Sequence, residues 1–164
     1  MKILIGIILS VSVLFGWSFE YKDIHKLTPK QKQVITESIN VGNTKGLGLE
    51  VAAIAMVETQ AGEYMGKVNR ICGVHQVDTL VQLSKMKSKG SSKLLCKTLD
   101  NNHKYSALLA TKELEYWISK SRNYQQAVNR YNRGWQPNKH DQTFWNRYNK
   151  AYTIIKQAVA KGDL

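Results

Sequence analysis

The sequence predicts an all-α domain, and three observations lead to this fold class. Apolar residues recur at helical spacing through most of the chain. No segment alternates apolar and polar residues over the length of a strand, and no internal repeat is visible. Only two prolines occur in 164 residues, so helices are seldom interrupted. We expect roughly six or seven helices, joined by short loops, around one buried central helix.

The first helix is predicted over residues 27–43, in the segment LTPKQKQVITESINVGN. Thr28 can cap its N-terminus, and Pro29 has the fixed φ angle that suits the first helical position. Gly42 and Asn43 are residues that commonly end a helix, so the segment carries both a start signal and a stop signal.

The second helix is predicted over residues 46–58, in the segment GLGLEVAAIAMVE. This segment is apolar on nearly every side, so we expect it to be the buried central helix. It ends in a carboxylate, Glu58, before the chain breaks at Gly62. Burying a carboxylate costs free energy unless the group is paired or has a chemical role.

Helical spacing of apolar residues continues to the C-terminus. Further helices are expected in 73–86 (after a turn), 91–99, 101–121, 123–132 and 141–160. Asp78 is interpreted as a first-turn charge of its helix, and Asp141 as the N-cap of the last helix. The spacing around Trp117 favours a core position for that residue.

The first 18 residues are typical of a secretory signal segment. Lys2 precedes 13 apolar or small residues from Ile3 to Phe15, and Gly16 and Ser18 form a small-x-small site. This run is shorter than the roughly 20 residues of a membrane-spanning helix. An uncleaved anchor in transient contact with the membrane is the alternative. Residues 19–164 then form one exported domain, periplasmic or extracellular, that is large enough to bury a core.

The two cysteines, Cys72 and Cys96, form an even pair, and an oxidising compartment would favour one disulfide between them. Two separate buried thiols are the alternative. Two cysteines at this spacing with no paired histidine make a poor zinc site, so no metal is expected.

The net charge favours an anionic partner. The chain has 24 Lys and Arg against 12 Asp and Glu, a formal charge of +12. Nucleic acid, a membrane surface and an acidic cell-wall polymer all fit this excess. The densest basic segment, SKMKSKGSSK at 84–93, lacks the interleaved aromatic residues of a single-strand binder, so no nucleic-acid partner is expected.

Three segments place polar groups where an apolar helix meets a loop: AIAMVET (53–59), GVHQV (73–77) and RYNRG (130–134). In this order they resemble the lytic transglycosylase family, whose catalytic domain is related to goose-type lysozyme. Members of that family show a Glu-Ser pair after an AIAxxE helix, then a GLMQI-like segment, then AYNxG and a tail of spaced aromatic residues. FWNRYNKAY (144–152) resembles that tail, and the likeness covers about residues 45–155.

The chain departs from the family pattern at several positions. Thr59 takes the place of the usual serine and keeps a hydroxyl group. Val74 and His75 replace the usual Leu-Met pair, and Arg130 replaces alanine. These departures concern substrate contact more than the identity of the acid.

The resemblance implies a lysozyme-like fold and a peptidoglycan lytic transglycosylase without a metal or organic cofactor. Its substrate would be the β-1,4 bond between N-acetylmuramic acid and N-acetylglucosamine in peptidoglycan glycan strands. Glu58 would protonate that bond and then take the proton of the C6 hydroxyl, which closes a 1,6-anhydro ring. Burial raises the pKa of a carboxyl group, as a general acid requires.

The resemblance also implies a set of residues around the acid. In the family the tyrosine of the third segment reaches toward the glutamate, the asparagine binds an N-acetyl group, and the glutamine of the second segment supports the site. Residues expected to contact substrate or support the acid are Thr59, His75, Gln76, Tyr131, Asn132, Trp135 and Tyr152. Core or turn-forming roles are the alternatives for Gln76, both tyrosines and Asn132, and solvent exposure is the alternative for His75.

Two alternative functions stay open. One is a hydrolytic goose-type lysozyme on the same fold, and Glu63, Asp78 or Asp141 could supply the second carboxylate of an ordinary glycosidase. The other is a non-catalytic wall-binding assembly protein. Trp117 and Trp145 are further residues that could stack on sugar rings. We expect a monomer that could serve a secretion or lysis apparatus.

Overall fold

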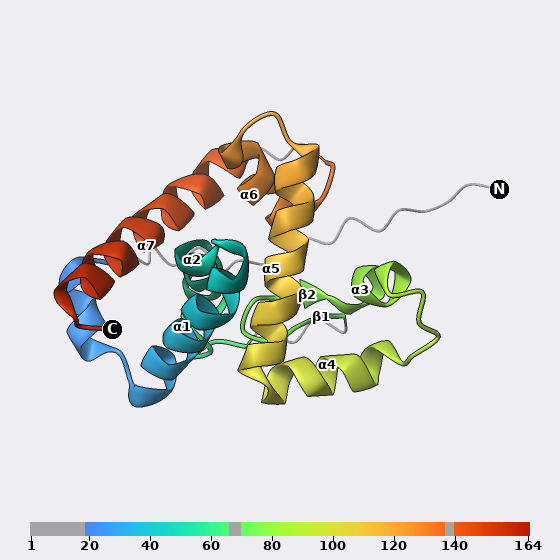
Figure 1. Ribbon diagram of the computed structural model, residues 1–164, viewed down its shortest axis with the longest axis horizontal. Helices are drawn as coiled ribbons and strands as arrows, with labels where there is room; N and C mark the ends of the chain where they lie inside the picture. The colour runs from blue at the N-terminus through green and yellow to red at the C-terminus, as the bar shows by residue number, and fades with distance from the viewer. Residues whose placement is uncertain (1–18, 66–69, 137–139) are drawn as a thin grey trace.

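The computed structural model describes residues 19–65, 70–136 and 140–164, so the predicted signal segment at 1–18 lies outside the described residues. Within them the chain is mostly helical, which confirms the all-α prediction (Figure 1). The α-helices are α1 (Pro29–Gly42), α2 (Gly48–Thr59), α3 (Thr79–Lys85), α4 (Ser92–Asn101), α5 (His103–Lys120), α6 (Tyr124–Arg133) and α7 (Asp141–Lys161). Two 3₁₀ turns, η1 (Tyr21–Lys26) and η2 (Asn43–Lys45), flank α1.

Helix α1 begins where the sequence predicts. Thr28 accepts a hydrogen bond from the Gln31 amide at 3.2 Å, and the Gln31 side chain accepts one from the Thr28 amide at 2.9 Å. This reciprocal capping box satisfies two backbone donors that the helix itself leaves unpaired. Pro29 occupies the first turn, where its missing N–H costs nothing.

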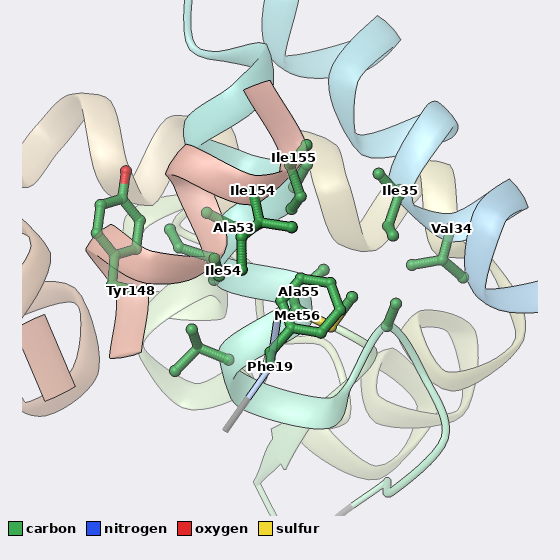
Figure 2. Packing of buried hydrophobic residues seen from close by; sticks show 14 of the residues in the cluster. Phe19, Val34, Ile35, Ala53, Ile54, Ala55, Met56, Tyr148, Ile154 and Ile155 are labelled. Carbon is green, nitrogen blue, oxygen red and sulfur yellow. The ribbon is translucent and has the colours of Figure 1, made fainter. Parts of the chain in front are cut away.

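Helix α2 is the buried central helix, as predicted. Its residues from Val51 to Val57 are all buried, and it packs against α1, α5 and α7. Figure 2 shows Val34 and Ile35 of α1 and Ile154 and Ile155 of α7 around the middle of α2. A helix that is apolar on every side is stable only when neighbours cover all of its faces.

A short β-hairpin lies between α2 and α3 in the chain. Strand β1 (Ile71–Cys72) pairs antiparallel with β2 (Val77–Asp78), with Cys72 opposite Val77. Sequence analysis did not predict these strands, because two residues are too few to show an alternating pattern. In the turn between them, Gly73 has φ +75° and a Cβ there would lie 2.5 Å from Ser106 Oγ. Only glycine therefore fits this position.

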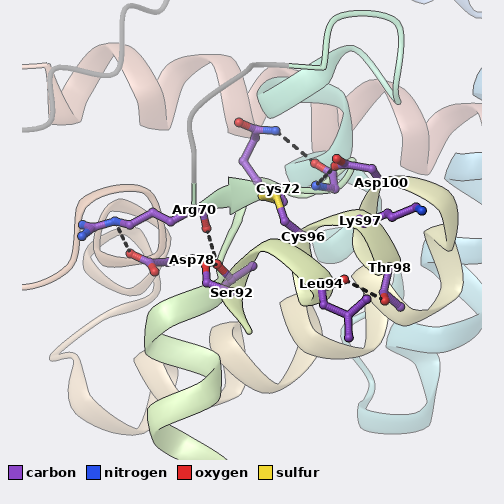
Figure 3. Close-up of a disulfide and its surroundings, with 12 residues drawn as sticks. Arg70, Cys72, Asp78, Ser92, Leu94, Cys96, Lys97, Thr98 and Asp100 are labelled. Carbon is purple, nitrogen blue, oxygen red and sulfur yellow. Dashed lines mark hydrogen bonds and ion pairs between the residues drawn. A yellow bond between two sulfur atoms is a disulfide. The ribbon is translucent and has the colours of Figure 1, made fainter. Parts of the chain in front are cut away.

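The predicted disulfide between Cys72 and Cys96 is present and ties β1 to α4, with the two Cα atoms 5.2 Å apart (Figure 3). A disulfide is compatible with an exported protein. Helices α3 and α4 pack on each other beside this tie. None of the described helices is long and apolar enough to cross a membrane.

Two aspartates differ from their predicted roles. Asp141 is the first residue of α7 rather than its N-cap, which is His140, and its carboxylate pairs with Arg133 of α6. Asp78 is the N-cap of α3 rather than a first-turn charge, and its side chain accepts from the amides of Leu80 and Val81. In both cases the neighbouring backbone sets the helix start one residue away from the position read from the sequence.

We expect the Cys72→Ser/Cys96→Ser double variant to lower the free energy of unfolding by about 3 kcal/mol, because the disulfide restricts the unfolded chain across the loop it closes. Urea denaturation of the oxidised wild type and the variant measures this difference. Reduced wild type should behave like the variant. An unchanged denaturation midpoint would show that the bond contributes nothing to stability.

Candidate active site

Glu58 lies in the last turn of α2, directly after the buried segment of that helix. The residue keeps part of its surface accessible to solvent, yet its side chain is surrounded closely enough for desolvation to dominate. Burial raises the pKa of Glu58 from 4.5 to about 7, and the positive charge of Arg147 acts in the opposite direction. A large fraction of the Glu58 carboxyl is therefore protonated at neutral pH.

Arg147 of α7 is a site residue that sequence analysis missed. Its guanidinium donates from Nη2 to the Val57 carbonyl at 2.9 Å, which also brings its charge near Glu58. The carbonyls at a helix C-terminus lack partners within the helix, and Arg147 supplies one. In the sequence it is one basic residue among 24, and no local signal singles it out.

Thr59 follows the acid and is only 1% exposed. Its hydroxyl contacts the Val74 carbonyl at 2.8 Å and the Ala55 carbonyl at 3.2 Å, and it accepts from the Gly62 amide at 2.9 Å. The predicted substrate contact of Thr59 is therefore wrong, because its hydrogen-bonding capacity is used inside the protein. Thr59 instead ties the end of α2 to the turn between β1 and β2.

Gln76 belongs to that turn and is partly exposed. Its backbone has φ +51°, and both its amide and its side-chain Nε2 donate to the Gly73 carbonyl at 3.0 Å. These bonds match the turn-forming alternative. Among the described residues, no hydrogen bond engages the side-chain oxygen of Gln76.

Tyr131 of α6 connects the turn with the surroundings of the acid. Its hydroxyl donates to the His75 carbonyl at 2.9 Å. Burial raises the pKa of the Tyr131 phenol well above its usual value, and the negative charge of Glu58 raises it further. Because the effect of a charge weakens with distance, the effect of Glu58 on the pKa of Tyr131 indicates that the two side chains lie near each other. Three segments that are distant in sequence thus converge at the end of α2.

His75 is 0% exposed, so the predicted sugar contact and the alternative of solvent exposure are both wrong. Its ring lies between two serines, with Nε2 at 3.0 Å from Ser38 Oγ and Nδ1 at 2.9 Å from Ser106 Oγ. Burial, and to a lesser degree the charge of His103, lowers the pKa of His75 to about 3. The imidazole is therefore neutral under ordinary conditions.

Tyr152 lies near a different carboxylate from the one expected. Its ring stacks on Tyr148, with centroids 6.3 Å apart, and burial and the charge of Glu50 raise its pKa. Among the bonds of the described residues none joins Tyr152 to Glu58. Glu50 lies in the first turn of α2 and Glu58 in its last turn, so Tyr152 lies near the opposite end of α2 from Glu58.

The remaining predicted residues lie on α6 or beside it. Asn132 is exposed near the end of α6. Trp135 is 56% exposed, contacts Trp117 edge-on at 5.1 Å, and has the Arg130 guanidinium 4.4 Å from its ring centre. Trp117 is buried, as predicted. The exposed face of Trp135 leaves it free for contact with a ligand.

Trp145 of α7 is half-buried in an aromatic cluster. It stacks on Tyr148 with centroids 5.6 Å apart and meets Tyr124 edge-on at 6.4 Å. The Tyr124 and Tyr148 hydroxyls share a hydrogen bond at 2.7 Å. Through these contacts, Trp145 forms part of the packing between α6 and α7.

The three candidates for a second carboxylate lie in environments that differ from that of Glu58. Asp141 is paired with Arg133, and Asp78 caps α3 and lies 3.3 Å from Arg70 Nε. Glu63 is exposed in the loop after α2. None of the three has a bond to Glu58 among the contacts of the described residues. The one described group of possible metal ligands is Cys72, Cys96 and Asp100, and its two sulfurs are bonded to each other.

Comparison with known proteins found no matching family profile, no matching curated protein and no matching solved structure.

The raised pKa of Glu58 predicts a specific pH dependence of stability. Because the folded-state pKa, about 7, exceeds the unfolded value of 4.5, the folded state binds more protons between these pH values, and stability falls as pH rises through this window. Between pH 4 and 8, the free energy of unfolding should fall in wild type and should fall by up to about 3 kcal/mol less in the Glu58→Gln variant. Urea denaturation at both pH values measures this, and equal losses would contradict it.

Removing the charge of Arg147 should raise the pKa of Glu58 further, because a nearby positive charge favours the carboxylate. We expect the carboxyl of Glu58 to titrate about one pH unit higher in the Arg147→Gln variant than in wild type, measured by NMR. The Lys150→Gln variant removes an exposed charge from the same helix and should leave the titration unchanged. A shift of equal size in both variants would assign the effect to net charge.

Proposed function

We propose that this protein is a peptidoglycan lytic transglycosylase with a lysozyme-like fold. The observation that carries the proposal is the environment of Glu58. A carboxyl group at the end of a buried apolar helix has a pKa near 7 and keeps an opening to solvent, and Tyr131 and the turn at 73–76 lie around it. This combination is what a general acid for glycosidic bond cleavage needs.

The first chemical step uses the protonated form of Glu58. The carboxyl donates its proton to the bridging oxygen between N-acetylmuramic acid and N-acetylglucosamine, and the C1–O bond breaks. A group whose pKa lies near the working pH is available in this form without being too weak an acid. The resulting Glu58 carboxylate is then placed to act as a base.

The environments of the candidate second carboxylates favour a transglycosylase, which needs none, over a hydrolase. The C6 hydroxyl of the muramic acid attacks C1 and gives its proton to Glu58, which restores the acid and leaves a 1,6-anhydro ring. An inverting or retaining hydrolase needs a second carboxylate near the bond. The described candidates cap a helix, pair with arginine or lie exposed in a loop. Intramolecular attack supplies a high effective concentration of nucleophile without one.

Charge and the disulfide fit a location at the cell wall. The formal charge of +12 favours contact with an anionic polymer, and the disulfide suits an oxidising compartment outside the cytoplasm. The exposed face of Trp135 can stack on a sugar ring. Asn132, exposed on the same helix end, can reach an N-acetyl group. These roles need no metal or organic cofactor.

We expect the Glu58→Gln variant to cleave purified peptidoglycan at least 100-fold more slowly than wild type, because an amide cannot donate the proton that the leaving oxygen requires. Mass spectrometry of the released fragments should show 1,6-anhydro products with wild-type protein. The Glu63→Gln variant changes a nearby exposed carboxylate in the same way and should retain full activity.

Other outcomes would replace the proposal. Fragments one water heavier than the anhydro products would identify a hydrolytic lysozyme. Anhydro products from Glu58→Gln at the wild-type rate would remove Glu58 from the mechanism. Sedimentation with peptidoglycan without cleavage by wild type or variant would indicate a wall-binding protein.

A further inference from the structure

Exposed apolar side chains gather on helices α3 and α4, and the chemistry proposed above uses none of them. Of the eight large apolar residues that are exposed in the described part of the chain, four lie between positions 80 and 94. They are Leu80 (49% exposed), Val81 (39%), Met86 (44%) and Leu94 (66%). Single exposed apolar residues are normal, whereas a group of them on one small part of the surface marks an interaction site.

The two helices form one lobe, residues 79–99, which we call the α3–α4 lobe. Thr79 Oγ1 at the start of α3 lies 2.5 Å from Ser92 Oγ at the start of α4, so the N-terminal ends of the helices meet. Leu80 and Leu94 each lie within two residues of this contact. Figure 1 shows the lobe on the side of the molecule away from α7, and Figure 3 shows Leu94 pointing away from the disulfide. The lobe therefore exposes apolar side chains from both helices to solvent.

The α3–α4 lobe carries only positive charge. Residues 79–99 contain five lysines and no aspartate or glutamate. Lys85 pairs with Glu113 of α5 at 2.6 Å. The other four are exposed, and none forms an ion pair with an acidic group in the described part of the chain: Lys87, Lys89, Lys93 and Lys97. The acids that flank the lobe, Asp78 and Asp100, accept hydrogen bonds from backbone amides. An anionic partner therefore meets uncompensated charge on this lobe.

Contacts with the rest of the protein hold both helices of the lobe in place. The disulfide joins Cys96 of α4 to Cys72 of β1. Glu113 of α5 accepts hydrogen bonds from the Gln82 and Lys85 side chains of α3, both at 2.6 Å. A surface that is already ordered loses little conformational entropy when a partner binds. The exposed apolar residues and lysines are thus presented on a rigid support.

We propose that the α3–α4 lobe docks on the surface of an anionic lipid bilayer. Its lysines meet the phosphate groups of the lipids, and its exposed leucines, valine and methionine enter the boundary between headgroups and acyl chains. The charge selects an anionic partner. The apolar side chains select lipid over an acidic wall polymer, whose polar surface offers them no burial. This contact lies outside the predicted signal segment and does not depend on the chemistry of Glu58.

The test is co-sedimentation of the full chain, as cells produce it, with vesicles of phosphatidylcholine that contain or lack phosphatidylglycerol. We expect binding to the anionic vesicles to be about tenfold tighter or more at low salt. The Lys87→Gln/Lys93→Gln variant should bind them about 25-fold more weakly than wild type, because each lysine near such a surface contributes about fivefold. The matched Lys150→Gln/Lys156→Gln variant removes the same charge from exposed positions on α7 and should bind within about twofold of wild type.

Apolar variants test the insertion into lipid. Leu80→Ser and Leu94→Ser should each weaken binding to anionic vesicles about fivefold, because the burial of an apolar side chain is lost. Val159→Ser removes an apolar side chain that is 40% exposed on α7 and should leave binding unchanged. Circular dichroism checks that each variant is folded. In wild type, anionic vesicles should slow hydrogen exchange within residues 79–99, and slowing only elsewhere would place the contact outside the lobe.

Three further results would overturn the proposal. Equal binding to both kinds of vesicle, or binding to neither, would exclude an anionic bilayer as the partner. Equal losses in the two lysine variants would assign the attraction to net charge and not to the lobe. Weaker binding in Lys87→Gln/Lys93→Gln with no change in either leucine variant would indicate an acidic polymer or protein that recognises charge alone. Because vesicle binding requires no cleavage, each result holds whether or not the protein cleaves peptidoglycan.

Discussion

Desolvation of a single carboxyl group is the constraint on which the rest of this structure depends. Helix α2 is apolar on every side, so α1, α5 and α7 must cover it, and Glu58 at its end shares that poorly solvated environment. The free energy spent in holding a carboxyl there is recovered from the many buried side chains of the same helix.

The end of α2 is held by polar contacts from three separate elements. Arg147 of α7 binds the Val57 carbonyl, Gln31 of α1 donates to the Gln60 carbonyl at 2.9 Å, and Thr59 is bonded to Val74 of the hairpin turn. The first two contacts satisfy carbonyls that the helix end leaves open, and in the third the Thr59 hydroxyl donates to the Val74 carbonyl. Because they come from different directions, they hold the position of Glu58 more firmly than its own helix could.

The disulfide supports the same hairpin turn. It anchors α4 to β1, and Asp100 of α4 accepts a hydrogen bond from the Gly73 amide at 2.8 Å (Figure 3). Gly73 begins the turn that carries His75 and Gln76. The disulfide thus supports the turn that the Tyr131 hydroxyl contacts.

What the sequence by itself determined is local in origin. The Thr28 cap, the all-round burial of α2 and the order of the helices follow from residues within a turn or two of one another, and the even cysteine pair follows from composition. Only the tertiary structure decided that His75 is buried between two serines, that Arg147 reaches Val57 and that Tyr152 lies near Glu50. Those contacts join residues far apart in the chain, and they depend on how the helices cross, which periodicity within a single helix does not encode.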